Sequence, residues 1–190
     1  MSLILDIETI PLSKSRITDF KEKFGEKNKK AKMGGLHFLT GRLVCAGVKH
    51  FNGPHMIFAD EDEDVILTGL IEYLREGRVD QLITFNGLKF DLPFLRLRAA
   101  LYGYDMTEYL PYEKYSKKHF DIYDQLGGKW GLNCTLAEYA WHFGLDTIED
   151  HGSNIAKMYK NHDWEGIIGH NLGDLITTEE IYKRLTNRKF

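Results

Sequence analysis

The segment Leu5-Asp6-Ile7-Glu8-Thr9 decides the fold, because it sets two acidic side chains into an apolar run that reads as a buried strand. Side chains at positions i and i+2 of a strand share a face, so Asp6 and Glu8 point one way while Leu5 and Ile7 point the other. Two carboxylates on one face repel each other unless a cation neutralises them, and a divalent metal does this best. The alternative is an exposed edge strand with acidic spots, and the apolar residues before Asp6 favour the metal site.

A third acidic residue, Asp91, ends the stretch FNGLKFD at residues 85–91, which runs from a strand through a glycine-containing turn into a helix. Asn86 offers a donor and an acceptor for a phosphate or sugar. Phe90 and Phe94, near the helix start, offer a wedge or stacking face for a base. Asp91 itself fits either a helix N-cap or a metal ligand, and the presence of Asp6 favours the ligand.

His170 and Asp174 are four residues apart, which places them on one face of a helix about one turn from each other. An imidazole exchanges a proton near neutral pH, so His170 could take a proton from an attacking water while Asp174 holds a metal. Taken alone, the two residues fit an ordinary surface i,i+4 pair better than a catalytic pair. The three other carboxylates favour the catalytic interpretation.

Hydrophobic patterning predicts one domain over residues 1–190, with a mixed five-stranded α/β sheet flanked by helices. Strands are expected over 2–7, 42–50, 55–59, 81–85 and 119–123, and helices after the acidic run 60–64, from Pro93, and over 135–143, 154–160 and 164–186. The acidic run favours a helix N-terminus rather than a metal site. Residues 13–35, crowded with lysines, are expected to form a basic insertion or long mobile loop that includes one helical turn. This segment is either a solvated basic face or a contact that guides a nucleic-acid strand.

The composition permits an intracellular nucleic-acid enzyme without requiring one. The 190 residues carry a formal net charge of −3, so any nucleic-acid contact must come from local patches. Cys45 and Cys134 match no zinc spacing and suit a reducing compartment. With no signal peptide and no apolar stretch of membrane-spanning length, we expect a soluble cytoplasmic protein that does not associate with a membrane.

Together these motifs resemble the DEDD superfamily of 3′–5′ exonucleases, which share the ribonuclease-H-like fold. The first motif is Asp-Ile-Glu-Thr at 6–9, and the second, Asn-Gly-Leu-Lys-Phe-Asp at 86–91, is similar to that of B-family DNA polymerase proofreading domains and their stand-alone relatives. The third motif departs from both main branches. His170 replaces the tyrosine of the polymerase-like branch but keeps its three-residue gap before Asp174, a pattern similar to that of predicted stand-alone ribonuclease-H-like exonucleases. The resemblance spans residues 3 to about 186.

The resemblance implies a set of functional residues and cofactors. Asp6, Glu8, Asp91 and Asp174 would bind two Mg²⁺ or Mn²⁺ ions, and His170 would orient or deprotonate the water. Residues implied to contact the strand are Thr9, Ile10, Asn86, Phe90 and Phe94, with Lys157 and Asn171 as weaker phosphate contacts. Asp121, close to a position where relatives also carry acids, is expected to be structural.

The implied reaction is hydrolysis of the terminal phosphodiester of single-stranded nucleic acid, DNA favoured over RNA, entering 3′ end first and releasing 5′-mononucleotides. A polymerase or another replication or repair protein is an expected partner, because the chain is too short to include a polymerase domain. Two alternatives stay open: an endonuclease or RNA-directed nuclease on the same fold, and a non-catalytic nucleic-acid-binding or polymerase-accessory module.

Overall fold

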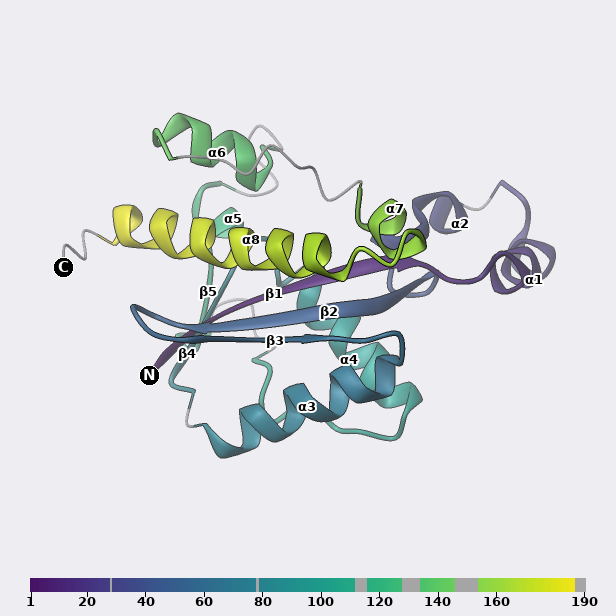
Figure 1. The fold of residues 1–190 in the computed structure, drawn as a ribbon, viewed down its shortest axis with the longest axis horizontal. Helices are drawn as coiled ribbons and strands as arrows, with labels where there is room; N and C mark the ends of the chain where they lie inside the picture. Colours follow the sequence, from purple (N-terminus) through teal and green to yellow (C-terminus); the bar gives the residue numbers. More distant parts are fainter. Residues whose placement is uncertain (28, 78, 112–115, 128–133, 146–153, 187–190) are drawn as a thin grey trace.

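The computed structural model describes residues 1–27, 29–77, 79–111, 116–127, 134–145 and 154–186. In these ranges five strands form one sheet in the order β3-β2-β1-β4-β5 (Figure 1). The strands are β1 (Ser2–Pro11), β2 (Gly41–His50), β3 (His55–Ala59), β4 (Gln81–Thr84) and β5 (His119–Asp121). The first three strands pair antiparallel, whereas β1 with β4 and β4 with β5 pair parallel. The predicted mixed sheet is confirmed, and β1 lies at its centre.

Helices cover both faces of the sheet (Figure 1). One face carries α3 (Glu63–Glu76) and α4 (Asp91–Leu101), and the other carries α5 (Ile122–Gln125), α6 (Leu136–His142), α7 (Ile155–Lys160) and the long α8 (Trp164–Leu185). The helices α1 (Lys14–Phe24) and α2 (Lys29–Met33), followed by the 3₁₀ turn η1 (Gly34–Leu36), lie beyond one end of the sheet. Among the described helices, none is both long and apolar enough to cross a membrane.

The alternation along β1 follows the sequence pattern. Leu3, Leu5 and Ile7 are buried in the core cluster formed with α3 and α4. Ile4 points the other way, into the cluster formed with α8. Since Asp6 shares the parity of Ile4, the acidic face of β1 lies under α8.

Residues 13–35 differ from the expected loop with one helical turn, because they contain the helices α1 and α2 and the 3₁₀ turn η1. Ser13 caps α1 by accepting a hydrogen bond from the Arg16 backbone N–H, and η1 closes the segment before β2. No residue of α1 is buried. Its apolar residues Ile17, Phe20 and Phe24 nevertheless follow a helical spacing, so the signal was present in the sequence, and the crowded lysines outweighed it in the prediction.

The acidic run before α3 has the expected structural role. Asp62 is the N-cap of α3 and accepts a hydrogen bond from the Asp64 backbone N–H at 3.0 Å. Glu63 is buried and forms an ion pair with Arg98 of α4. The run therefore joins the two helices on this face of the sheet.

Candidate active site

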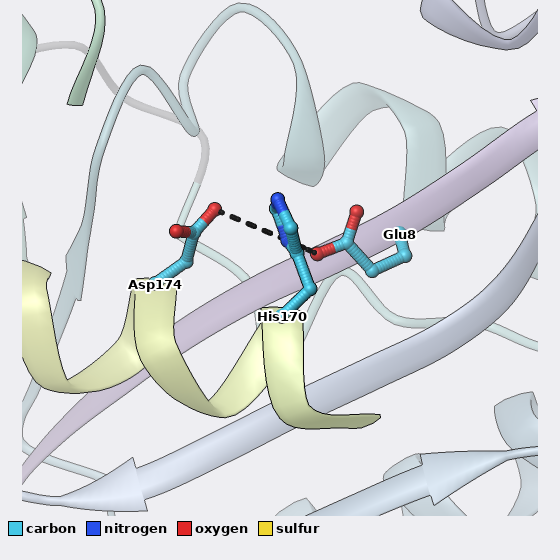
Figure 2. Close-up of side chains that lie close together, drawn as sticks. All are labelled: Glu8, His170 and Asp174. Carbon is cyan, nitrogen blue, oxygen red and sulfur yellow. Dashed lines mark hydrogen bonds and ion pairs between the residues drawn. The ribbon is translucent and has the colours of Figure 1, made fainter. Parts of the chain in front are cut away.

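Glu8, His170 and Asp174 form a close cluster where α8 crosses β1 (Figure 2). The Nδ1 atom of His170 lies 2.9 Å from Oε1 of Glu8 and 3.7 Å from Oδ2 of Asp174. Glu8 and His170 are each 6% exposed, while the Asp174 side chain is 35% exposed. The predicted helical face is thus the one that meets the acidic face of the strand, and the surface-pair alternative is wrong.

Asp6 is held from α8 by a different residue, Asn171. The Asn171 Nδ2 atom donates a hydrogen bond to Oδ2 of Asp6 at 2.8 Å, and Asn171 is fully buried. The sequence prediction gave Asn171 a phosphate contact, whereas its amide here binds a carboxylate of the site. No strong local signal in the sequence pointed to this pairing, because the partners are 165 residues apart.

Gly47 makes this close approach of α8 possible. It lies opposite Asp6 on β2, and a Cβ atom there would fall well inside van der Waals contact of Asn171 Oδ1 and 2.8 Å from Leu175 Cδ1. Only a residue without a side chain lets the helix settle this near the strand. Gly47 is therefore a residue of the site that the sequence motifs did not identify.

Asp91 reaches the site from the other edge of β1. It is the first residue of α4 and is 3% exposed, and its Oδ1 accepts a hydrogen bond from the Ile7 backbone N–H at 3.2 Å. The pairing of β4 with β1 ends at Ile4, so the Ile7 backbone N–H has no partner on β4. The Asp91 carboxylate accepts this hydrogen bond instead. The N-cap alternative is wrong, because the cap residue is Phe90 and makes no side-chain capping bond.

The turn before α4 is built on Asp121, which has the expected structural role. Its carboxylate accepts hydrogen bonds from the backbone N–H groups of Asn86 and Leu88, each at 2.9 Å. Asn86 has a positive φ of 62°, a backbone region open to asparagine more than to most residues. Its side-chain Oδ1 is buried and finds no hydrogen-bond partner among the described residues.

Burial and mutual repulsion favour protons on the clustered carboxyls. Burial raises the pKa of Asp6 well above its usual value, and the charges of Glu8 and Asp174 raise it further. Burial raises the pKa of Asp91 to about 8, although hydrogen bonds from its own N–H and that of Ile7 oppose the rise. The pKa of Asp174 rises to about 6, mainly through burial, with His170 opposing and Glu8 adding to the shift.

This donor set fits a hard divalent cation. Four carboxylates supply oxygen ligands, which Mg²⁺ and Mn²⁺ prefer. Burial raises the pKa values of Asp6, Asp91 and Asp174, and repulsion from neighbouring carboxylates adds to each shift. One ligand atom from each of Glu8, His170 and Asp174 lies within 4.8 Å of the others, a spacing that one cation can span. A bound cation would offset the repulsion that now favours protonation.

The predicted strand contacts are only partly accessible. Phe94 is fully buried in the core cluster beside α3, so its ring offers no face to a base and its assignment as a stacking residue is wrong. Phe90 is half-buried and packs on Phe94 with ring centroids 5.6 Å apart. Phe90 thus remains the aromatic side chain of this turn with exposed surface.

Thr9, Ile10 and Lys157 differ in exposure. The Thr9 hydroxyl donates to the Gly35 carbonyl at 2.7 Å, which fixes η1 against β1. Ile10 is 6% exposed and packs on Ile155 of α7. Lys157 is exposed on α7. Thr9 and Ile10 can therefore contact a nucleotide mainly through backbone atoms.

The family model described as the RNase_H superfamily matches residues 3–186 of the chain. A DNA polymerase of Methanocaldococcus jannaschii is 28% identical over 152 residues, which cover 71% of this chain and 9% of that polymerase. The catalytic subunit of DNA polymerase epsilon from Emericella nidulans is 34% identical over 73 residues, covering 38% of this chain and 3% of that protein. The chain spans less than a tenth of the length of these curated relatives.

The fold is also similar to that of a solved polymerase. The family B DNA polymerase from Pyrobaculum calidifontis aligns with a TM-score of 0.69 and 17% identity, covering 96% of this chain and 24% of that one. The resemblance to the ribonuclease-H-like fold and to B-family DNA polymerases is thereby confirmed.

Proposed function

This chain belongs to the RNase_H superfamily, and from that premise we propose that it is a metal-dependent 3′–5′ exonuclease of single-stranded nucleic acid. The observation that carries the proposal is the convergence of Asp6, Glu8, Asp91 and Asp174 beside His170, from β1, α4 and α8. A domain without chemistry has no use for four carboxylates that repel one another. The substrate is a single strand, with DNA favoured, and the products are 5′-mononucleotides.

The four carboxylates would hold two Mg²⁺ or Mn²⁺ ions. Such ions, when bound, supply Lewis-acid stabilisation for the attacking and leaving oxygens of an in-line displacement. The protein's own contribution is to fix the ligands: Asn171 holds Asp6, and the Ile7 backbone N–H holds Asp91. Prearranged ligands lower the reorganisation that the reaction requires.

His170 is placed to handle the proton of the attacking water. Its Nδ1 atom is anchored by Glu8, and the second ring nitrogen points away from Glu8 and Asp174 (Figure 2). Anchoring one nitrogen orients the ring and sets which nitrogen can accept a proton. We assign His170 the role of positioning or deprotonating the water, with Asp174 one turn further along the helix.

The substrate contacts follow from the surroundings of these acids. Phe90 offers a partly exposed ring for the base, Asn86 lies in the turn before it, and Lys157 supplies a positive charge from α7. Because the relatives with matching segments are DNA polymerases of far greater length, we also propose that the chain works alongside a polymerase or another replication or repair protein.

Digestion of linear and circular single strands tests the proposal. Matched DNA and RNA oligonucleotides are incubated with Mg²⁺, Mn²⁺ or EDTA, and the products are separated by size. We expect metal-dependent release of 5′-mononucleotides from the linear strand and none from the circle, with the faster substrate revealing the preferred sugar. Cleavage of the circle would indicate an endonuclease, and no cleavage by folded protein with either metal would favour a binding module.

A further inference from the structure

A cavity of about 470 Å³ opens at the end of β1, two residues beyond Glu8. Its lining includes Ile10, Arg16, Arg42, Arg98, Tyr102 and Tyr159. These residues come from β1, α1, β2, α4 and α7, with Tyr102 just after α4, so the cavity lies where the end of the sheet meets helices of both faces. None of the motifs that define the carboxylate site includes an arginine of this cavity.

Arg42 lies on the same side of the sheet as the carboxylate site. It is directly opposite Ile10 in the antiparallel pairing of β1 and β2, and opposed residues share a face. Ile10 packs with Ile155 of α7, on the face of the sheet that α8 covers. It therefore lies on the same face as Glu8, although the pairing register of β1 and β2 shifts between Glu8 and Thr9. Two strand residues span roughly 7 Å, which is within the length of one nucleotide unit.

The Arg42 guanidinium is held in place without being neutralised. Its carbon lies 5.0 Å from the ring centroid of Tyr159, and its NH2 atom donates to the Tyr159 hydroxyl. Its NH1 atom donates to the Glu61 backbone carbonyl at 3.3 Å, while the Glu61 carboxylate lies 3.3 Å from Nδ1 of His162. Among the described residues, Arg42 thus has neutral hydrogen-bond partners, and its charge remains available to an anion.

Glu63, the acidic residue in the cavity lining, already has an ion-pair partner and a backbone donor. Its carboxylate accepts from Arg98 Nε at 2.8 and 3.0 Å and from the Leu43 backbone N–H at 2.6 Å. With Arg98 balanced by Glu63, Arg16 and Arg42 leave the lining with a net positive charge. A half-buried guanidinium that is held by Tyr159 presents its remaining N–H donors in the planar arrangement that suits phosphate oxygens.

We propose that this cavity binds an internal phosphate of the substrate strand, with Arg42 as the residue that holds it. The inference rests on the proposed function and extends it by adding a site for the strand beyond the scissile bond. Because only the terminal nucleotide lies on the 3′ side of that bond, the phosphate bound by Arg42 is on its 5′ side. Arg42 therefore increases the affinity for a nucleic-acid strand and not for a single nucleotide, which has no internal phosphate.

The test compares two substrates in the Arg42→Ala and Arg42→Lys variants. A single-stranded DNA 12-mer carries internal phosphates, whereas the p-nitrophenyl ester of thymidine 5′-monophosphate has one phosphodiester and nothing beyond it. We expect Arg42→Ala to raise KM for the 12-mer about tenfold, as for one lost charge-assisted hydrogen bond, and to leave the ester unchanged. In Arg42→Ala, the slope of log Kd against log salt concentration for the 12-mer should be smaller by about 0.7, the value for one lost phosphate contact. Arg42→Lys should recover part of the lost affinity.

Arg75→Ala is the matched control, because Arg75 is an exposed arginine in the last turn of α3. Thermal melting establishes that each variant is folded. An equal loss on both substrates, or no loss on the 12-mer, overturns the inference. If the wild-type protein cleaves neither substrate, the proposed nuclease function fails. The phosphate site at Arg42 is then tested by the fluorescence anisotropy of a labelled 12-mer, and equal Kd values for wild type and Arg42→Ala overturn the inference.

Discussion

Asn171 on α8 donates its side-chain amide to Asp6 on β1 at 2.8 Å, across 165 residues of sequence. This hydrogen bond ties the helix carrying His170 and Asp174 to the strand carrying Asp6 and Glu8. It also opposes the rise in the pKa of Asp6 that burial causes. The contact therefore fixes the spacing of the carboxylate site, and it partly offsets the rise in the pKa of one of its members.

Replacing Gly47 by alanine should damage this contact. The added Cβ would collide with Asn171 Oδ1 and lie 2.8 Å from Leu175 Cδ1, so α8 must shift away from β2. Overpacking of this kind costs about 1–3 kcal/mol of unfolding free energy. We expect a lower midpoint in urea unfolding together with a loss of nuclease activity.

Gly169→Ala is the control for that variant, since Gly169 lies in the same helix and a Cβ there meets nothing within 4 Å. An alanine in an open helix position should stabilise by about 0.5–1 kcal/mol. If Gly47→Ala behaved like Gly169→Ala, the close approach of α8 to the strand would be wrong.

The raised carboxyl pKa values predict that the metal-free protein loses stability as the pH rises. The pKa of Asp91 is about 8 and that of Asp174 about 6, both above the ordinary value of 3.8 expected in the unfolded chain. Between those values the native state keeps protons that the unfolded chain has released. Their contribution to stability is thus fully present below about pH 4 and is lost as the pH rises through about 6 and then 8.

Thermal melting in EDTA and in Mg²⁺ measures this effect. Mg²⁺ should raise Tm more at about pH 8 than at about pH 5, because protons compete with the metal for the same carboxylates. Asp91→Asn, which keeps an acceptor for the Ile7 N–H, should flatten the EDTA profile near pH 8 and reduce the Mg²⁺ effect. The same Mg²⁺ shift at both pH values would argue against a carboxylate metal site.

His170→Gln should lower the rate and change its pH dependence. Glutamine can still donate a hydrogen bond to Glu8, so the variant removes the titrating ring while retaining the anchor. Loss of a general base typically costs about 10²–10⁴-fold in rate. Initial rates across pH would show the limb of the wild-type profile that disappears.

His142→Gln, at an exposed position of α6, is the control and should match the wild-type profile. A His170→Gln profile that differs from wild type only by a constant factor would remove His170 from proton transfer and leave it a positioning role.

The strands and the helices with apolar faces were predictable because burial leaves a periodic pattern. Asp6 and Glu8 could be assigned to one face from strand parity alone, and His170 and Asp174 to one face from their spacing. The helix α1 was missed although Ile17, Phe20 and Phe24 follow a helical spacing, because the lysines around them favoured a solvated loop. Phe94 was misassigned because a sequence does not distinguish an aromatic ring in the core from one beside a substrate.

The supporting contacts could not be predicted for a different reason. Gly47 and Asn171 matter only because a strand and a distant helix meet at one point, and neither carries a local motif. Arg42 likewise gains its significance from Tyr159, 117 residues away. Such pairs depend on the tertiary fold, so residues that hold a site in place are harder to find than those that define it.

The most direct test of the central claim follows one single strand labelled at its 5′ end and, separately, at its 3′ end, in Mg²⁺. Wild-type protein and Glu72→Gln, a control at an exposed acid of α3, should give a ladder that shortens from the 3′ end and immediate release of the 3′ label as a mononucleotide. Asp6→Ala should remain folded and leave both strands intact. Shortening from the 5′ end, or an Asp6→Ala protein as active as wild type, would contradict the account.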